Sequence, residues 1–597
     1  MNEILMGNEA VALGLIEAGC SVLSAYPGTP SSEILPYAAK LKKQFDLPIF
    51  VEWSVNEKCA FELVYANSII GGNSAVIMKQ VGLNVAMDSL MSAAYIGHTG
   101  GMVVVVADDP GPVSSQTEQD SRFAAMFAKL PVFDPSSPEE AREFAKEAML
   151  LSRQYQIPVI LRITGRIAHW KTNITFNAID KTTVNRNVSF DKNPLRWAAI
   201  PKFRHLQHIE LNKKLQTISD SDDFYFHLKK SKTNTNLIIT SGVCYSHIRD
   251  ALDFLDAETF VDIVKVNIPF PVSEKVKDIA TNYDRIIVIE EMYPVIEYQL
   301  RNIKINGRLT GEIPKEGELT INTIIDILKK FFKFDKKTPE TFSTTPKKPE
   351  LCAGCPHRNS FYAIKKAFPN GIYPSDIGCY TLGLNMGAVD TCLCMGATVN
   401  QASGFYQGFK TNGKEIPPII ATIGDSTFFH GGVSGLINAV YQKSAFVLVI
   451  LDNSTVAMTG FQPTPENGIL NSGKGNSVSI EKLIQGCGVE KLAIINPSNI
   501  ENTVEVIRKF WDYSIKNEKV SVVIAKAPCA ILAKKEGMFG EIKVTIDDSC
   551  TNCSKCINDF QCPAIYSNGK KAEIDYSICI GCGVCMQVCP VGAIKNG

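Results

Sequence analysis

The sequence predicts an α/β protein of several doubly wound domains, followed by a small cysteine-rich domain. Apolar strands such as 102–107 and 446–451 alternate with helix-like segments, which is typical of parallel sheets covered on both faces. The chain has 597 residues, too many for a single hydrophobic core. Eight of its 18 cysteines fall within the last 48 residues. These observations separate a multi-domain α/β body from a C-terminal metal-binding domain.

The composition excludes several classes of protein. Lysine plus arginine and aspartate plus glutamate both number 61, so the basic excess of a nucleic-acid-binding protein is missing. The longest apolar runs are far shorter than a membrane span, and the first residues lack the pattern of a signal peptide. Cysteines clustered at short spacings indicate metal or iron–sulfur binding rather than disulfides. We therefore expect a cytoplasmic protein in a reducing compartment, with no nucleic-acid or membrane partner.

Residues 1–170 repeat a strand–loop–helix order with polar strand ends, as expected of one doubly wound domain. A strand at 21–26 leads into a turn that contains Thr29, whose neighbouring hydroxyls can cap the next helix or bind an anion. A plain helix cap is the alternative. The strand at 49–53 precedes a helix that opens near Glu57.

The rest of the chain divides by changes in pattern and composition. We expect a polar connector at 171–234, a transketolase C-terminal-like α/β domain at 235–333, a linker rich in Lys, Thr and Pro at 334–350, a third α/β domain at 351–536, and the cysteine-rich domain at 540–597.

The third α/β domain carries a candidate diphosphate site. An apolar strand is broken by Gly424-Asp425-Ser426, and a second buried strand ends in Asp452-Asn453. Ligands of such sheets sit beyond the carboxyl ends of neighbouring strands, and oxygen donors suit Mg²⁺. The pair is a variant, at two positions, of the thiamine diphosphate (TPP) fingerprint that begins Gly-Asp-Gly and ends Asn-Asn. We expect Asp425, Asn453 and a backbone carbonyl near Thr455 to bind Mg²⁺; the alternative is two ordinary turns.

A TPP enzyme also needs a carboxylate that hydrogen-bonds the aminopyrimidine ring of the cofactor. It is expected at a helix start in another α/β domain, and Glu57 fits best, with Glu52 and Glu62 as nearby rivals. The alternative for Glu57 is a first-turn carboxylate that only complements the helix dipole.

The C-terminal cysteines form two runs, and the second has the spacing of bacterial ferredoxins. In that pattern the fourth cysteine of each run binds the other cluster. The prediction is therefore one [4Fe–4S] cluster at Cys550, Cys553, Cys556 and Cys589, and a second at Cys562, Cys579, Cys582 and Cys585. A proline after each last cysteine disfavours zinc ribbons and disulfides.

Motifs along nearly the whole chain resemble the 2-oxoacid:ferredoxin oxidoreductases, and within them the alpha subunits of indolepyruvate:ferredoxin oxidoreductase. They are YPGTPSS at 26–32, NEK at 56–58, VGLN at 81–84, ADDPG at 107–111, SSQTEQDSR at 114–122, CAGCPHR at 352–358, DIGCYTL at 376–382, DTCLCMG at 390–396, GDSTFFH at 424–430, and the ferredoxin-like tail.

The resemblance implies oxidative decarboxylation of aryl-pyruvates such as indolepyruvate. Coenzyme A would take the acyl group, CO₂ would leave, and ferredoxin would receive the electrons. It implies an aminopyrimidine-binding domain at 1–170, a diphosphate-binding domain at 351–536, and a smaller beta subunit in a heterodimer or heterotetramer. It also places Thr29 near the substrate carboxylate. The arginine that pyruvate-oxidising relatives use is missing, and Lys79 and Arg166 are the substitutes.

By the same resemblance Cys352, Cys355, Cys379 and Cys529 match a third cluster; buried, unligated thiols are the alternative. Two other functions stay open from sequence alone. One is a TPP-dependent decarboxylase without net oxidation, in which the clusters are structural. The other is a non-catalytic electron-transfer subunit whose α/β domains are only a scaffold.

Overall fold

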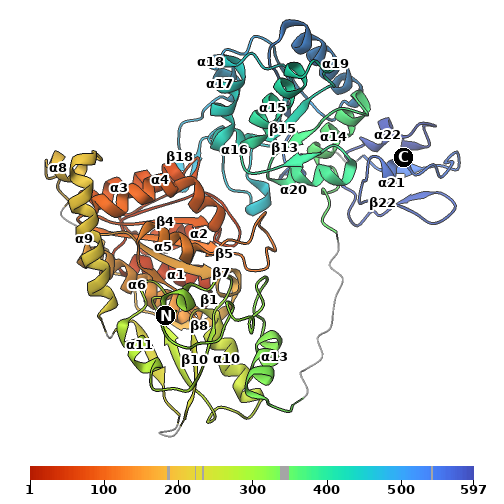
Figure 1. Cartoon of the computed structure of the whole chain (residues 1–597). Coiled ribbons are helices and arrows are strands. Elements are labelled where there is room, and N and C mark those ends of the chain that lie inside the picture. Colours follow the sequence, from red (N-terminus) through yellow and green to blue (C-terminus); the bar gives the residue numbers. More distant parts are fainter. Residues whose placement is uncertain (185–187, 222, 231–233, 337–347, 539–541) are drawn as a thin grey trace. The chain divides into compact units, whose positions relative to one another are not determined.

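The computed structural model describes residues 1–184, 188–221, 223–230, 234–336, 348–538 and 542–597, and it divides into two compact units, Met1–Ser343 and Thr344–Gly597 (Figure 1). Most of the predicted linker, residues 337–347, lies outside the described residues. Both units contain parallel sheets with helices between successive strands, which confirms the predicted α/β class.

Unit 1 is built on a six-stranded parallel sheet with the strand order β3-β2-β4-β5-β7-β6. Its centre, β5, is buried at every position because its sequence is apolar almost throughout. Helix α1 packs against α2 and α6, whereas α3 packs against α4. The strands are β2 Val22–Ala25, β3 Phe50–Trp53, β4 Asn73–Lys79, β5 Gly101–Asp108, β6 Val132–Phe133 and β7 Val159–Thr164. The helices are α1 Gly7–Glu17, α2 Ile34–Gln44, α3 Glu57–Ile69, α4 Gln80–Ile96, α5 Ser121–Ala128, α6 Pro138–Tyr155 and α7 Gly165–His169.

A second, four-stranded sheet of unit 1 has the order β12-β10-β11-β9, in which only β9 is antiparallel to its neighbour. Its strands are β9 Tyr225–Leu228, β10 Asn236–Thr240, β11 Asp262–Val266 and β12 Arg285–Ile289. Its helices are α10 Val243–Phe254, α11 Glu274–Ala280, α12 Val295–Gln299 and α13 Ile321–Phe332.

The range 171–234 differs from the expected connector. It contains β8 (Lys171–Thr175), which pairs with β1 (Asn2–Met6), the short helix α8 (Pro194–Trp197), the long helix α9 (Pro201–Ser219), and β9. Leu211 and Ile218 of α9 are buried in the unit 1 core. Its sequence is mostly polar, and a few buried side chains were too weak a pattern to reveal the helix.

Buried arginines link the two sheets of unit 1. Arg122, at the start of α5, reaches Glu290 at the end of β12 with an Nη1–Oε2 distance of 3.0 Å. Arg162 of β7 pairs with Asp108 at the end of β5, 2.8 Å away, and with Asp134, 3.0 Å away. Polar strand ends of both sheets therefore meet in one network of paired charges.

Unit 2 contains a four-stranded parallel sheet with the order β15-β16-β20-β19. The strands are β15 Ile420–Gly424, β16 Val447–Asp452, β19 Leu492–Ile495 and β20 Ser521–Lys526, and the short pair β13 Pro374–Ser375 and β14 Thr391–Cys392 lies beside them. The main helices are α14 Pro356–Ala367, α15 Ala397–Thr411, α16 Asp425–Thr427, α17 Val433–Tyr441, α18 Ile480–Gly486, α19 Ile500–Asn517 and α20 Ala530–Lys535.

The C-terminal domain belongs to unit 2 and shares its hydrophobic core. It consists of two small antiparallel pairs, β21 Val544–Ile546 with β24 Ile594–Asn596 and β22 Ile565–Ser567 with β23 Ala572–Ile574, and the short helices α21 Lys555–Asn558 and α22 Cys585–Val588. In the described part of the chain, no helix combines the length and apolar character needed to cross a membrane.

Candidate functional site

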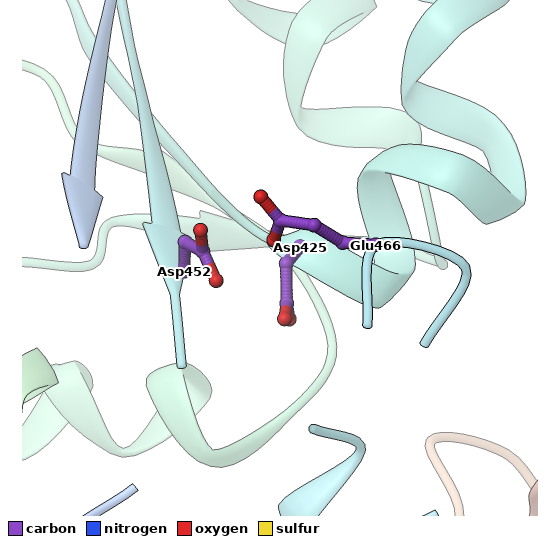
Figure 2. A group of neighbouring side chains, drawn as sticks. All are labelled: Asp425, Asp452 and Glu466. Atoms are coloured by element: carbon purple, nitrogen blue, oxygen red, sulfur yellow. The ribbon is translucent and has the colours of Figure 1, made fainter. Parts of the chain in front are cut away.

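Three carboxylates meet beyond the strand ends of unit 2. Asp425 follows β15, and Asp452 ends the neighbouring parallel strand β16. Glu466 comes from the loop after β16, and one oxygen of each carboxylate lies within 4.8 Å of the others (Figure 2). The sequence predicted Asp425 and Asn453 here but missed Glu466, because no motif surrounds it and only the path of the loop brings it to the strand ends.

Asp425 is the carboxylate of this trio whose ionised form is least favourable. It is 3% exposed; its Oδ1 accepts a hydrogen bond from the Ser426 backbone N–H at 2.8 Å, whereas its Oδ2 has no hydrogen-bond partner among the described residues. Burial, and then the neighbouring charge of Asp452, raise the pKa of Asp425 well above its usual value. A divalent cation with oxygen ligands would relieve both effects, so this donor set fits Mg²⁺.

Lys526, at the end of β20, already compensates part of the negative charge. Its Nζ lies 3.0 Å from Asp452 Oδ2 and 2.5 Å from Glu466 Oε1. The other oxygen of Asp452 accepts the Ser454 backbone N–H at 3.0 Å. Lys526 therefore balances one oxygen each of Asp452 and Glu466, whereas Asp425 Oδ2 and Glu466 Oε2 have no hydrogen-bond partner among the described residues.

Asn453 is held in place by a buried histidine. Its Nδ2 lies 3.2 Å from His357 Nε2, and its Oδ1 accepts the Thr455 backbone N–H at 3.2 Å. Burial lowers the pKa of His357 to about 4, so the neutral ring can accept the amide hydrogen. This contact fixes which side of the Asn453 amide presents oxygen. Sequence reasoning did not single out His357.

Gly424 makes room for an aromatic side chain. A Cβ at this position would lie 2.3 Å from the ring of Tyr380, too close for any other residue. The Tyr380 hydroxyl donates to the Ile377 carbonyl at 2.7 Å and lies 2.5 Å from Thr427 Oγ1. Tyr380 therefore locks the turn that presents Asp425.

In unit 1, Glu57 lies in the first turn of α3 and is 6% exposed. Its carboxylate rests against Gly82, where a Cβ would fall 2.5 Å from Oε1. The two rivals are placed differently. Glu62 is solvent-exposed and pairs with Lys58, whereas Glu52 is buried within β3. Of the three, Glu57 is the one presented at a helix start against a glycine.

Thr29 lies near a lysine without a carboxylate partner. The Lys79 Nζ donates to the Ser114 carbonyl at 2.6 Å, and Ser114 Oγ donates to the Thr29 carbonyl at 3.2 Å. Lys79 forms no ion pair with any described residue; burial lowers its pKa, and the charge of nearby Asp109 partly opposes this. Arg166, the other candidate for the substrate carboxylate, donates to both carboxylate oxygens of Glu318, at 2.7 and 2.9 Å. The available cation beside Thr29 is therefore Lys79.

The eight C-terminal cysteines surround two small cavities. One is lined by Cys550, Cys553, Cys556 and Cys589, and the other by Cys562, Cys579, Cys582 and Cys585. These are the two sets that the ferredoxin-like spacing predicts, including the exchanged fourth cysteine. Ala353 and Gly354 also line the second cavity, so the loop between Cys352 and Cys355 reaches the C-terminal domain.

The cysteines of the implied third set lie near one another as well. Burial, followed by the neighbouring thiols of Cys355, Cys352 and Cys529, raises the pKa of Cys379 to about 12. Cys355 and Cys529 are buried, Cys379 is partly buried and Cys352 is exposed, and four neighbouring thiols of this kind suit a soft metal cluster. Among the His, Cys, Asp and Glu side chains of the described ranges, only Asp425, Asp452 and Glu466 form a group close enough to hold a single metal ion.

Family models match three parts of the chain. "Thiamine pyrophosphate enzyme, C-terminal TPP binding domain" matches residues 376–525. "Pyruvate flavodoxin/ferredoxin oxidoreductase, thiamine diP-bdg" matches residues 13–217, and "4Fe-4S binding domain" matches residues 572–595. The predicted fold class, TPP-enzyme domains with a C-terminal ferredoxin-like domain, is confirmed.

Relatives match over nearly their full length. The "Indolepyruvate oxidoreductase subunit IorA" of Archaeoglobus fulgidus is 39% identical, over 99% of this chain and 97% of the relative. The proteins of that name from Pyrococcus horikoshii and Methanothermobacter marburgensis are each 37% identical, over 99% of this chain and 96% and 97% of the relative.

Proposed function

Because the chain belongs to the IorA subunit family of indolepyruvate oxidoreductases, catalytic subunits of the 2-oxoacid:ferredoxin type, we propose that it oxidatively decarboxylates aryl-pyruvates such as indolepyruvate. In this reaction the bond between the carboxylate and the 2-oxo carbon breaks and CO₂ leaves. The 2-oxo carbon then bonds to the sulfur of coenzyme A, whose proton goes to solvent, and two electrons pass to ferredoxin.

The unpartnered oxygen of Asp425 is the observation that supports this proposal most directly. It lies at the strand ends of the domain that the TPP-binding family model matches. We assign Mg²⁺ to Asp425, Asn453 and the backbone carbonyl of Thr455, and the cofactor's diphosphate to the turn from Gly424 to Ser426. When bound, thiamine diphosphate supplies the carbon nucleophile for the 2-oxo carbon and takes up the electron pair left by CO₂.

Glu57, Thr29 and Lys79 would act on the aminopyrimidine ring and on the substrate. The Glu57 carboxyl would hydrogen-bond the aminopyrimidine ring and hold a proton there, while Gly82 keeps space for it. Thr29 would face the substrate carboxylate, with the Lys79 ammonium group as its counter-charge. The half-buried setting of Lys79 favours binding a single carboxylate, because water competes less there.

The cysteine sets would carry the electrons away one at a time. We assign a [4Fe–4S] cluster to each C-terminal set of four cysteines, and a third to Cys352, Cys355, Cys379 and Cys529. Twelve cysteines that bind iron as thiolates must stay reduced, which supports a reducing, cytoplasmic environment. Ferredoxin is the acceptor in this scheme, and a smaller beta subunit completes the enzyme.

Dye reduction by the complete enzyme tests the proposal. The chain, produced with its beta subunit, is supplied with TPP, Mg²⁺ and coenzyme A and offered a panel of 2-oxoacids. We expect aryl-pyruvates to reduce a viologen dye in a coenzyme A-dependent manner, and Asp425→Ala and Glu57→Ala to remove this activity. Iron analysis should give about twelve atoms per chain for three clusters and about eight for two.

Other outcomes would overturn the proposal. Aldehyde release without any electron acceptor would identify a non-oxidative decarboxylase. Failure to bind TPP with Mg²⁺ in a calorimetric titration would leave only an electron-transfer subunit.

A further inference from the structure

Arg358 is a buried cation that forms no ion pair with a carboxylate among the described residues. It lies in the first turn of α14 and is 1% exposed. Its guanidinium donates only to backbone carbonyls, which are those of Leu351, Cys352, Phe560 and Gln561. In the described part of the chain its Nε has no hydrogen-bond partner.

Such an arrangement is costly without a further anion. A guanidinium stays charged in proteins, and a buried charge needs an opposite charge as well as hydrogen bonds. The ionisable groups that act on Arg358 are mainly the thiols of Cys562, Cys355 and Cys352, with Glu350 in addition. As neutral thiols, these cysteines provide no counter-charge. As ligands of iron–sulfur clusters, they would.

The cysteines around Arg358 come from two different sets. Its carbonyl partners lie next to Cys352 on one side and next to Cys562 on the other. The two loops are in close contact, since a Cβ on Gly354 would lie 2.1 Å from Ile580 and 3.6 Å from the Cβ of Cys582. The guanidinium therefore stands where the third cysteine set meets the C-terminal domain.

We propose that Arg358 is the shared counter-charge of two iron–sulfur clusters, one at Cys562, Cys579, Cys582 and Cys585 and the other at Cys352, Cys355, Cys379 and Cys529. This rests on the proposed function, which assigns clusters to both sets. An electron that enters either cluster reduces it and adds one negative charge beside the guanidinium; when the electron passes to the other cluster, the first is oxidised again and the charge moves with it. A fixed cation there stabilises the reduced state and so raises the reduction potential of both clusters. Arg358 is a positioning residue in this scheme.

Two substitutions separate charge from hydrogen bonding. Arg358→Lys keeps the positive charge but cannot reach all four carbonyls, whereas Arg358→Gln keeps a donor group without the charge. A control is Arg508→Gln, because Arg508 also donates to backbone carbonyls, those of Ala367 and Lys366, but contacts no cysteine loop. Each enzyme would be titrated against electrode potential and followed by electron paramagnetic resonance, with iron and sulfide measured in parallel.

We expect Arg358→Gln to lower the ratio of reduced to oxidised cluster at fixed potential by about tenfold, which corresponds to about 59 mV for a one-electron couple. Arg358→Lys should stay close to wild type, and Arg508→Gln should be unchanged. Loss of about four irons in Arg358→Gln but not in Arg358→Lys would also support the proposal, since the charge would then be needed to hold a cluster.

Wild-type potentials and iron content in Arg358→Gln would overturn the proposal, as would a shift in Arg358→Lys alone. The measurement needs no substrate, so its outcome is separate from that of the proposed function. Clusters with the expected potentials in a protein that oxidises no 2-oxoacid would overturn only the proposed function. A wild-type chain that binds no clusters would overturn both.

Discussion

The two units bury their charges in different ways. In unit 1, Arg122 lies 2.6 Å from Asp120 and 3.0 Å from Glu290, and Arg162 pairs with two aspartates. In unit 2, Arg358 has only backbone carbonyls, and Asp425 has an oxygen without a hydrogen-bond partner. Removing these charges from water is unfavourable in both units. Ion pairs with carboxylates offset this for Arg122 and Arg162 of unit 1, whereas Arg358 forms none with the described residues.

The difference separates structural from functional charge. A buried charge that is fully paired fastens elements together, as the unit 1 arginines do for its two sheets. A buried charge left unpaired needs a group that the chain does not supply. In unit 2 these unpaired charges lie at the strand ends and between cysteine sets, where a cation and anionic clusters are proposed.

The largest effect is expected from breaking the unit 1 network. Arg162→Met leaves Asp108 and Asp134 buried without their partner, and should lower the free energy of unfolding of unit 1 by about 3–5 kcal/mol. Hydrogen–deuterium exchange of peptides from β5 and β7 would measure it. Arg166→Met is the control, because its exposed pair with Glu318 should contribute at most about 1 kcal/mol. Equal effects of both substitutions would contradict the comparison.

Asp425→Asn should not lower the stability of the protein. In the cofactor-free protein it removes an unpartnered buried carboxyl, so stability should stay unchanged or rise by about 1 kcal/mol. The affinity for TPP with Mg²⁺ should fall by about a hundredfold or more, because a cation ligand is lost. Denaturant unfolding and calorimetry measure the two quantities. A destabilised variant that binds the cofactor normally would show that Asp425 is a structural charge.

The sequence predicted those parts of the site that depend on local pattern. Asp425 and Asn453 follow apolar strands, and the spacing of the C-terminal cysteines reports their grouping directly. His357, Glu466 and Lys526 were missed because their contacts join segments far apart in the sequence. Arg358 lies in the CAGCPHR motif at 352–358, but the amino-acid sequence does not show that its side chain is buried and forms no ion pair with a described carboxylate. Burial and pairing of charges are tertiary properties.

Unit 1 is not free of unpartnered charge: Asp108 Oδ1 and Glu291 Oε2 have no hydrogen-bond partner among the described residues, and Lys79 forms no ion pair there. It is a partly buried cation with neutral acceptors, so by the same reasoning it should await an anion. We expect Lys79→Met to raise KM for the 2-oxoacid by about ten- to a hundredfold, the value of one charged hydrogen bond, with little change in the affinity for TPP. Arg166→Gln, whose side chain is already paired, should leave KM nearly unchanged. The reverse result would identify Arg166, not Lys79, as the residue that binds the substrate carboxylate.

The smallest effect is expected at Lys526, which partly compensates the carboxylate trio. This ammonium group neutralises Asp452 and Glu466 beside the proposed Mg²⁺ ligands, and so reduces the negative charge that attracts the cation. Lys526→Met should therefore tighten Mg²⁺ binding about two- to fivefold, a modest change because the lysine side chain is 40% exposed and its pairs are screened by water. Titration of Mg²⁺ at saturating TPP measures it, and Lys519→Met, which breaks a surface pair with Glu490, is the control. Weaker Mg²⁺ binding in Lys526→Met would mean that the lysine holds the carboxylates in the geometry that binding needs. The paired charges of unit 2 would then belong to the site as much as its unpaired ones.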